Sequence, residues 1–220
     1  MAALVLVSAA CNTAALAQPA AVTAPALAAS ALTGETRETL AWVMASRDHG
    51  GKPFMVVDKR AAQVSVFNGR GQLLGAAPAL LGMAQGDVDT PGNGLKRVSQ
   101  IKPDERITPA GRFATEPGRG LQGDAIVWFD YAAGLAIHRV RPGAAQGARM
   151  QRLASQAGQQ ASAQRVSLGC VVLTPAFFDA VVKPSLGQQA GVIYVLPETR
   201  PLKTLLASLA APAPVLAVAK

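Results

Sequence analysis

The chain has 220 residues, half of them hydrophobic and 15% charged, which predicts one domain with its own core and excludes a polytopic membrane protein and a fully disordered chain. Its two cysteines and two histidines are too few for a disulfide framework or a multi-cysteine zinc site. The net charge of +8 lies entirely in residues 35–220, but no run of five or more basic residues occurs, so a dedicated nucleic-acid binder is disfavoured.

The first segment of the chain has the features of an export signal. Residues 1–17 form an uncharged apolar run that ends with small residues at the positions a signal peptidase accepts. We therefore expect cleavage after residue 17 and a location in the periplasm or cell envelope. Two alternatives stay open. A lipid anchor at Cys11 needs a lipoprotein cleavage site, which Ser8 fits poorly because Leu is usual there, and an Ala-rich helix could stay on the protein.

A linker and a short helix follow. Residues 18–34 are rich in Ala, Pro, Ser and Thr and carry no charge, which is typical of a linker. Residues 35–47 place Leu40 and Val43 at helical spacing, with acidic residues early and an arginine late. This pattern predicts a short amphipathic helix that ends before Gly50.

The pattern then changes to short apolar runs separated by turn residues such as Asn68-Gly69. Such runs predict β-strands, so the protein is expected to be mainly β with few helices. The runs cover residues 54–57, 64–67, 73–76, 125–129, 135–140, 170–173 and 192–196.

Two further helical segments and a tail are predicted. Thr174 and the proline after it offer an N-cap and a favourable first position for a helix over residues 176–183, ending near Pro184. Residues 147–164, rich in Gln and Ala, predict an exposed helix or loop insertion. We place the folded domain at residues 35–206 and expect residues 207–220 to be a flexible tail.

Cys170 is the leading candidate for chemistry. Once the export signal is removed it is the only thiol, and such a cysteine is buried and inert, bridged to another chain, or kept because its thiolate reacts. It follows Ser167, Leu168 and Gly169 at the start of an apolar run. Glycine there allows a positive φ and a close approach of the backbone, and backbone N–H groups at such a turn can hold an oxyanion.

His138 is the natural base for that thiol. A cysteine needs a neighbouring base or a positive field, because the thiolate is the nucleophile and the free pKa is about 8.5. His138 is the one titratable ring within the apolar run 135–140, whereas His49 follows a predicted helix and is interpreted as a loop residue or a charge at the helix end. Because His138 precedes Cys170, the order disfavours papain-like peptidases, in which the nucleophile comes first.

Three motifs together resemble the catalytic domain of the L,D-transpeptidases, enzymes of the bacterial cell wall. Residues 108–113 (TPAGRF) look like the family's Thr-Pro-x-Gly-x-Phe turn. Ile137-His138 looks like its strand histidine, and residues 167–171 (SLGCV) look like its Ser-x-Gly-Cys-hydrophobic signature. The motifs occur in the family's order, and the similar region runs over residues 54–196.

The resemblance implies a β-sandwich or barrel of mixed sheets with a few short helices. It implies that Cys170, deprotonated by His138, attacks a carbonyl of a peptidoglycan stem peptide and forms a thioester, which an amine of another stem or water then resolves. The amides of Gly169 and Cys170 would hold the oxyanion, with Ser167 and Leu168 in the same positioning turn. No metal or organic cofactor is required, and we expect a monomer with no nucleic-acid partner and no membrane span.

The chain departs from the family pattern close to both candidates. Leu168 stands where the family has His, Val172 where it has Arg or Asn, and Arg139 where it has Gly. The interval 141–166 is also longer than usual. An uncharged Val172 cannot bind a substrate carboxylate, so we hypothesise that Arg139 or Arg141 does, because a guanidinium pairs well with that group.

Alternative interpretations stay open beside this one. The chain could be a non-catalytic peptidoglycan- or envelope-binding protein on a degenerate transpeptidase scaffold, or an L,D-carboxypeptidase that hydrolyses without cross-linking. Trp128 is interpreted as core or as the wall of a substrate cleft. Residues 108–113 are interpreted as architectural, because Pro and Gly set a bend that Phe113 anchors.

Overall fold

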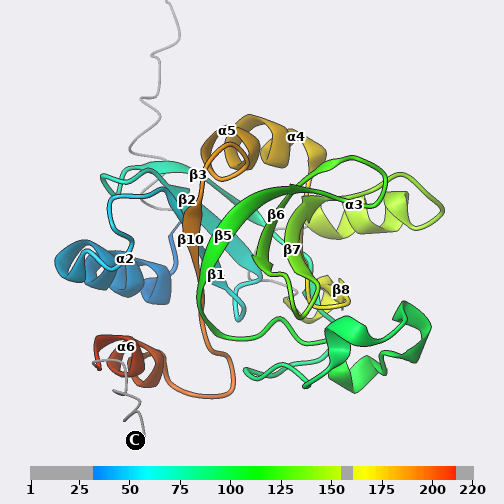
Figure 1. The fold of residues 1–220 in the computed structure, drawn as a ribbon, viewed down its shortest axis with the longest axis horizontal. Helices are drawn as coiled ribbons and strands as arrows, with labels where there is room; N and C mark the ends of the chain where they lie inside the picture. Colours follow the sequence, from blue (N-terminus) through cyan, green and yellow to red (C-terminus); the bar gives the residue numbers. More distant parts are fainter. Residues whose placement is uncertain (1–31, 155–160, 212–220) are drawn as a thin grey trace, which may run out of the picture.

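The structure is a computed structural model that describes residues 32–154 and 161–211 (Figure 1). The predicted signal peptide, the candidate lipid-anchor cysteine and most of the predicted linker fall in residues 1–31, outside the described residues. So do residues 212–220, which make up most of the predicted tail.

The described residues form one large mixed sheet and one small sheet. The strands are β1 (Phe54–Asp58), β2 (Gln63–Phe67), β3 (Leu73–Pro78), β4 (Leu81–Gly82), β5 (Gly111–Arg119), β6 (Ala125–Asp130), β7 (Leu135–Arg139), β8 (Arg165–Ser167), β9 (Val171–Leu173) and β10 (Gly191–Val195). The large sheet has the order β3-β2-β1-β10-β5-β6-β7-β9, and β4 pairs with β8. Parallel pairs β1–β10 and β7–β9 occur among antiparallel ones, which confirms the predicted mainly β class with mixed sheets.

Short helices surround the large sheet (Figure 1). The α-helical segments are α2 (Gly34–Ser46), α3 (Gln146–Ala154), α4 (Pro175–Phe177), α5 (Lys183–Ser185) and α6 (Leu202–Ala210), with a π-helical turn, η5 (Phe178–Val182), between α4 and α5. The 3-10 turns are η1 (Asn93–Leu95), η2 (Val98–Gln100), η3 (Pro103–Glu105) and η4 (Ala161–Gln164). Within the described parts of the chain, no helix is long and apolar enough to cross a membrane.

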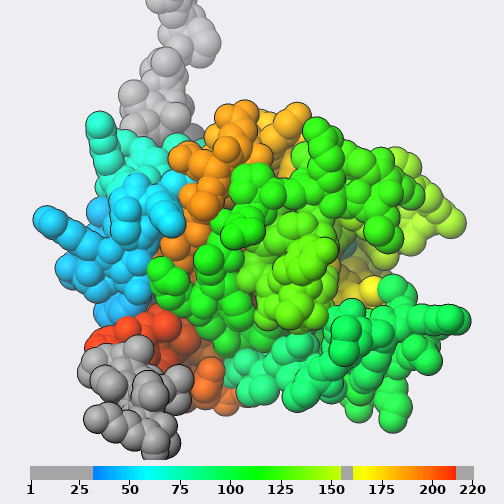
Figure 2. Space-filling view, in the orientation of Figure 1, coloured from blue at the N-terminus to red at the C-terminus, as the bar shows by residue number. Residues whose placement is uncertain are grey.

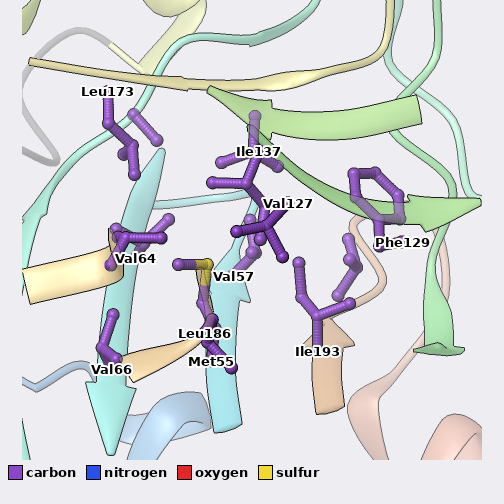
Figure 3. Packing of buried hydrophobic residues seen from close by; sticks show 14 of the residues in the cluster. Met55, Val57, Val64, Val66, Val127, Phe129, Ile137, Leu173, Leu186 and Ile193 are labelled. Atoms are coloured by element: carbon purple, nitrogen blue, oxygen red, sulfur yellow. The ribbon is translucent and has the colours of Figure 1, made fainter. Parts of the chain in front are cut away.

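The large sheet bends around one apolar cluster, which we call the main core. Figure 3 shows Met55 and Val66 of one half of the sheet lying toward Val127 and Ile137 of the other half. Strands from both ends of the sheet therefore cover the same core, as a sandwich or barrel requires. Phe178 and Val182 of η5, together with Leu186 directly after α5, contribute to this core.

The central strand β1 is buried on both faces. Met55 and Val57 point into the main core, while Phe54 and Val56 pack with α2 and α6 in a second cluster. Side chains alternate between the two faces along a strand. The sequence of a strand that is covered on both faces is therefore a continuous apolar run. This is why β1 is recognisable in the sequence without any alternation.

Three details differ from the sequence-based predictions. The predicted helix ends near Pro184 as expected, but it includes a π-helical turn, η5, and Pro184 itself, whose missing N–H falls in the first turn of α5. The insertion predicted as exposed buries Leu153 of α3. Residues 207–210, predicted as the start of the tail, belong to α6.

Candidate active site

His138 lies on the face of β7 that points away from the main core. Its neighbour Ile137 is fully buried in the main core, and side chains alternate along a strand, so His138 points to the opposite face. The register of β7 with β9 places His138 opposite Val172, and the register of β6 with β7 places Trp128 opposite Ala136. These side chains share one outer face of the sheet.

Cys170 comes directly before β9 and shares the same face as His138. It lies two residues before Val172, and both pack in a small cluster that also contains Leu80, Val140 and Leu153. In an ideal sheet, a strand spacing of about 4.8 Å and an offset of two residues correspond to a Cα separation of about 8 Å. Cys170 is half-buried, and its Sγ lies 3.8 Å from the carbonyl oxygen of Gly134.

The His138 ring is oriented by its own strand. Its Nδ1 lies 2.8 Å from the carbonyl oxygen of Arg139, and a carbonyl can only accept, so Nδ1 must carry the proton. In the neutral ring, Nε2 is then the free basic nitrogen. Burial lowers the pKa of His138 more than this hydrogen bond raises it, so the ring is neutral at pH 7 and able to accept a proton.

The Cys170 thiol is also neutral in the resting protein. Burial raises the pKa of Cys170, and a hydrogen bond with the backbone of Ala136 and the charge of Arg141 lower it only in part. Because the pKa of the acid is raised and that of the base is lowered, a preformed thiolate–imidazolium pair is disfavoured. Attack by this thiol on a substrate would therefore require its proton to leave during the reaction.

The turn before Cys170 is closed by internal hydrogen bonds. Ser167 Oγ accepts from the N–H of Gly169 at 3.1 Å and donates to the carbonyl of Cys170 at 2.7 Å. Of the two amides expected to hold an oxyanion, that of Gly169 is thus already engaged. Leu168, between these residues, is half-buried.

The structure brings one of the two predicted arginines to the site. Arg141 lies near enough for its charge to act on both Cys170 and His138, and its Nε lies 3.3 Å from Asp124 Oδ2. Arg139 is opposite Leu173 of the main core and so points to the other face. There its Nη1 lies 2.6 Å from Asp179 Oδ1.

Trp128 lies opposite Ala136 of β7, on the outer face of the sheet. Its ring covers Gly118, where a Cβ would come within 2.4 Å of the indole, and it packs edge-on against Tyr131 at a centroid distance of 5.0 Å. Figure 2 shows a hollow between residues 93–106 (green) and α3 (yellow-green), with yellow surface of the chain after residue 161 inside it.

Sequence reasoning missed an arginine of the insertion. Arg149 of α3 is half-buried, and its charge helps to lower the pKa of His138, an effect smaller than that of burial. Met150 and Leu153 anchor α3 on the small cluster beside Cys170. Their spacing of three residues within a polar run is the signal that could have indicated one apolar edge on this helix.

The other titratable groups give no second centre within the described ranges. His49 is buried near α2, where its Nε2 donates to the carbonyl of Gly69 at 3.0 Å. No group of three or more His, Cys, Asp or Glu that could hold a metal ion occurs among the residues described.

Comparisons with known proteins give only distant likenesses. No protein-family model matches this chain, and no curated protein matches its sequence. One similar solved structure is the L,D-transpeptidase LdtMt1 in complex with imipenem, with 20% identity over 66% of this chain and a TM-score of 0.37. Another is a fused Zn-dependent amidase/peptidase/peptidoglycan-binding domain-containing protein from Clostridium acetobutylicum, with 12% identity over 76% of this chain and a TM-score of 0.33. The chain covers 58% and 65% of those two chains, less than two thirds of each.

Proposed function

We propose that the protein is an exported cysteine acyltransferase that acts on peptidoglycan stem peptides as an L,D-transpeptidase. One observation carries the proposal: a half-buried thiol and an imidazole with a free Nε2 share one face of adjacent parallel strands. The substrate class rests on the resemblance of residues 108–113, 137–138 and 167–171 to the motifs of that family.

In the proposed reaction, Cys170 and His138 carry out the bond formation and the proton transfers. As the Cys170 sulfur attacks the substrate carbonyl, its proton passes to Nε2 of His138, so a C–S bond forms without a free thiolate in the resting state. Collapse of the tetrahedral intermediate breaks the C–N bond, and His138 returns the proton to the leaving amine. The thioester is then attacked by an acceptor. An amine gives a cross-link, and water gives hydrolysis.

Two further groups complete the proposed site. The N–H of Cys170 is the amide left for the oxyanion, because that of Gly169 is bound to Ser167. Arg141 is the cation we assign to a substrate carboxylate, since its charge acts on both catalytic residues while Arg139 points to the other face. Trp128 supplies an apolar wall.

A binding protein without activity is the second candidate. The engaged amide of Gly169 and the raised pKa of the Cys170 thiol both weaken the machinery for acyl transfer. The same scaffold could then hold stem peptides without cleaving them.

Muropeptide turnover separates these functions. We expect the purified protein to convert stem tetrapeptides into a cross-linked dimer or into tripeptide plus D-Ala, as followed by mass spectrometry, and Cys170→Ala to do neither. A carbapenem should add its mass to the intact protein but not to Cys170→Ala. If the wild-type protein binds muropeptides without product and without acylation, the binding function replaces the enzyme.

A further inference from the structure

The hydroxyl of Thr108 joins the nucleophile turn to the neighbouring strand. Thr108 is fully buried. Its Oγ1 donates to the carbonyl of Gly169 at 2.8 Å and accepts from the N–H of Gly82 in β4 at 2.9 Å. Both hydroxyl functions of this side chain are therefore used, and one of them ends on the residue before Cys170.

Two glycines allow the chain around Thr108 to come this close. A Cβ at Gly169, whose φ is +125°, would lie 2.6 Å from the carbonyl oxygen of Ile107. A Cβ at Gly82 would lie 2.4 Å from the carbonyl oxygen of Arg106. The backbone of residues 106–107 is thus in close contact with Gly82 on one side and with Gly169 on the other. The Thr108 hydroxyl therefore has little room to move.

The backbone of Thr108 is fixed from the other side by a buried ammonium group. Lys59 is fully buried, and its Nζ donates to the carbonyl of Thr108 at 2.9 Å. The same Nζ lies 2.9 Å from Asp87 Oδ1 and 3.4 Å from Glu198 Oε1. Thr108 therefore connects a charged buried network to the turn that carries the nucleophile.

The carbonyl that Thr108 binds belongs to the same peptide plane as the N–H of Cys170. In a trans peptide these two groups point in opposite directions. A fixed carbonyl of Gly169 therefore fixes where the Cys170 N–H points, and this is the amide that remains for an oxyanion.

We propose that Thr108 is a positioning residue, whose hydroxyl fixes the peptide unit between Gly169 and Cys170 and so aims the oxyanion donor and the thiol. This inference rests on the proposed acyl-transfer function for its catalytic consequence. The positioning of the thiol itself can be measured without any substrate.

Thr108→Val removes both hydrogen bonds at nearly constant volume. We expect kcat for muropeptide turnover, or the rate of carbapenem acylation, to fall about 10²-fold with little change in KM, because a displacement of about 1 Å costs that much. The pH midpoint of Cys170 alkylation by iodoacetamide should also move toward that of a free thiol, since a loosened turn exposes the sulfur. Thr108→Ser, which keeps the hydroxyl, should preserve the wild-type midpoint and most of the rate.

Thr115→Val is the matched control. Thr115 is also fully buried in the sheet, but its Oγ1 has no hydrogen-bond partner, so its loss should leave the alkylation midpoint and the acylation rate unchanged. If Thr108→Val behaves like Thr115→Val in both measurements, the inference is overturned.

Folding and function are kept separate in this test. Should Thr108→Val fail to fold, Thr108→Ser and Thr108→Ala replace it, because both lose the methyl group and only the second loses the hydroxyl. Equal midpoints for these two variants would refute the positioning role. A wild-type protein that neither turns over muropeptides nor acylates refutes the proposed function, while the alkylation midpoints still decide the role of Thr108.

Discussion

At the level of single residues, the candidate site holds two neutral groups rather than an ion pair. Burial disfavours the thiolate of Cys170 and the imidazolium of His138 at the same time. The charge of Arg141 favours the thiolate but opposes the imidazolium, so it cannot stabilise the pair as a whole. The reaction then depends on the basicity of Nε2 at the moment of attack.

This protonation state predicts a specific pH dependence. Alkylation of Cys170 by iodoacetamide should increase with pH, with a midpoint above the ordinary thiol value of about 8.5, because burial raises the pKa of this thiol. In His138→Gln the midpoint should move little, since a neutral ring does not stabilise the thiolate. Carbapenem acylation should nevertheless fall about 10²–10⁴-fold through loss of the base. A wild-type midpoint below about 8.5 would contradict the neutral pair and indicate a preformed thiolate.

We expect Arg141 and Arg139 to differ in their effect on turnover, because only Arg141 lies near the candidate residues. Arg141→Gln should lower kcat/KM for muropeptides about 10- to 100-fold, because a hydrogen bond to a charged group contributes about 1.5–3 kcal/mol. Arg139→Gln is the matched control, since it removes a half-exposed pair with Asp179 on the other face, which stabilises the fold by about 1 kcal/mol at most. Steady-state kinetics of both variants decide the assignment, and equal losses would argue against it.

At the level of elements, apolar runs predict strands both where the strand is fully buried, as in β1, and where it is only partly buried, as in β3. The seven predicted runs correspond to strands of the large sheet. The strand β5 is not predicted, because its sequence contains no apolar run and includes Pro117 and Gly118. Its pairing with β6 is local, but its pairing with β10 joins segments far apart in the chain, which a local pattern does not encode.

The same limit applies to the candidate site. Cys170 and His138 can be picked out because each is a single reactive residue in an apolar run, but their shared face depends on the parallel register of β7 and β9. Arg149 and Thr108 contribute through contacts between segments far apart in the chain. The sequence therefore predicts the reacting groups and picks out the motif over residues 108–113, but it does not show which contacts Thr108 and Arg149 make.

At the level of the whole molecule, a buried charged network joins segments that lie far apart in the sequence. Lys59 follows β1, Asp87 follows β4, and Glu198 follows β10. Arg165 of β8 pairs with Glu198. Burial raises the pKa of Asp87, but hydrogen bonds from Thr199, from the backbone of Glu198 and from Lys59 outweigh it and hold the pKa well below its usual range.

Replacing the buried ammonium group should destabilise the whole fold at neutral pH. Lys59→Met removes the cation nearest to Asp87, which keeps only Arg200 at 3.9 Å, while Glu198 keeps its pair with Arg165. Loss of one partner of a buried ion pair typically costs about 3–5 kcal/mol. Arg60→Met is a control on the next residue, because its ion pair with Glu35 is far more exposed. Urea unfolding at pH 7 measures both, and a loss below about 1 kcal/mol for Lys59→Met would show that the network contributes little.

The lowered pKa of Asp87 predicts acid sensitivity of the fold. The unfolded chain has the ordinary Asp pKa of about 3.9, so the stabilisation is complete above that pH and is lost as pH falls toward the lower folded pKa. By pH 3 this one group should have cost about 1 kcal/mol of unfolding free energy. Asp87→Asn should therefore lose less stability between pH 7 and pH 3 than the wild type, as measured by urea unfolding. Asp104→Asn, at an exposed carboxylate, should keep the wild-type difference, and an unchanged difference in Asp87→Asn would mean that other carboxylates govern acid unfolding.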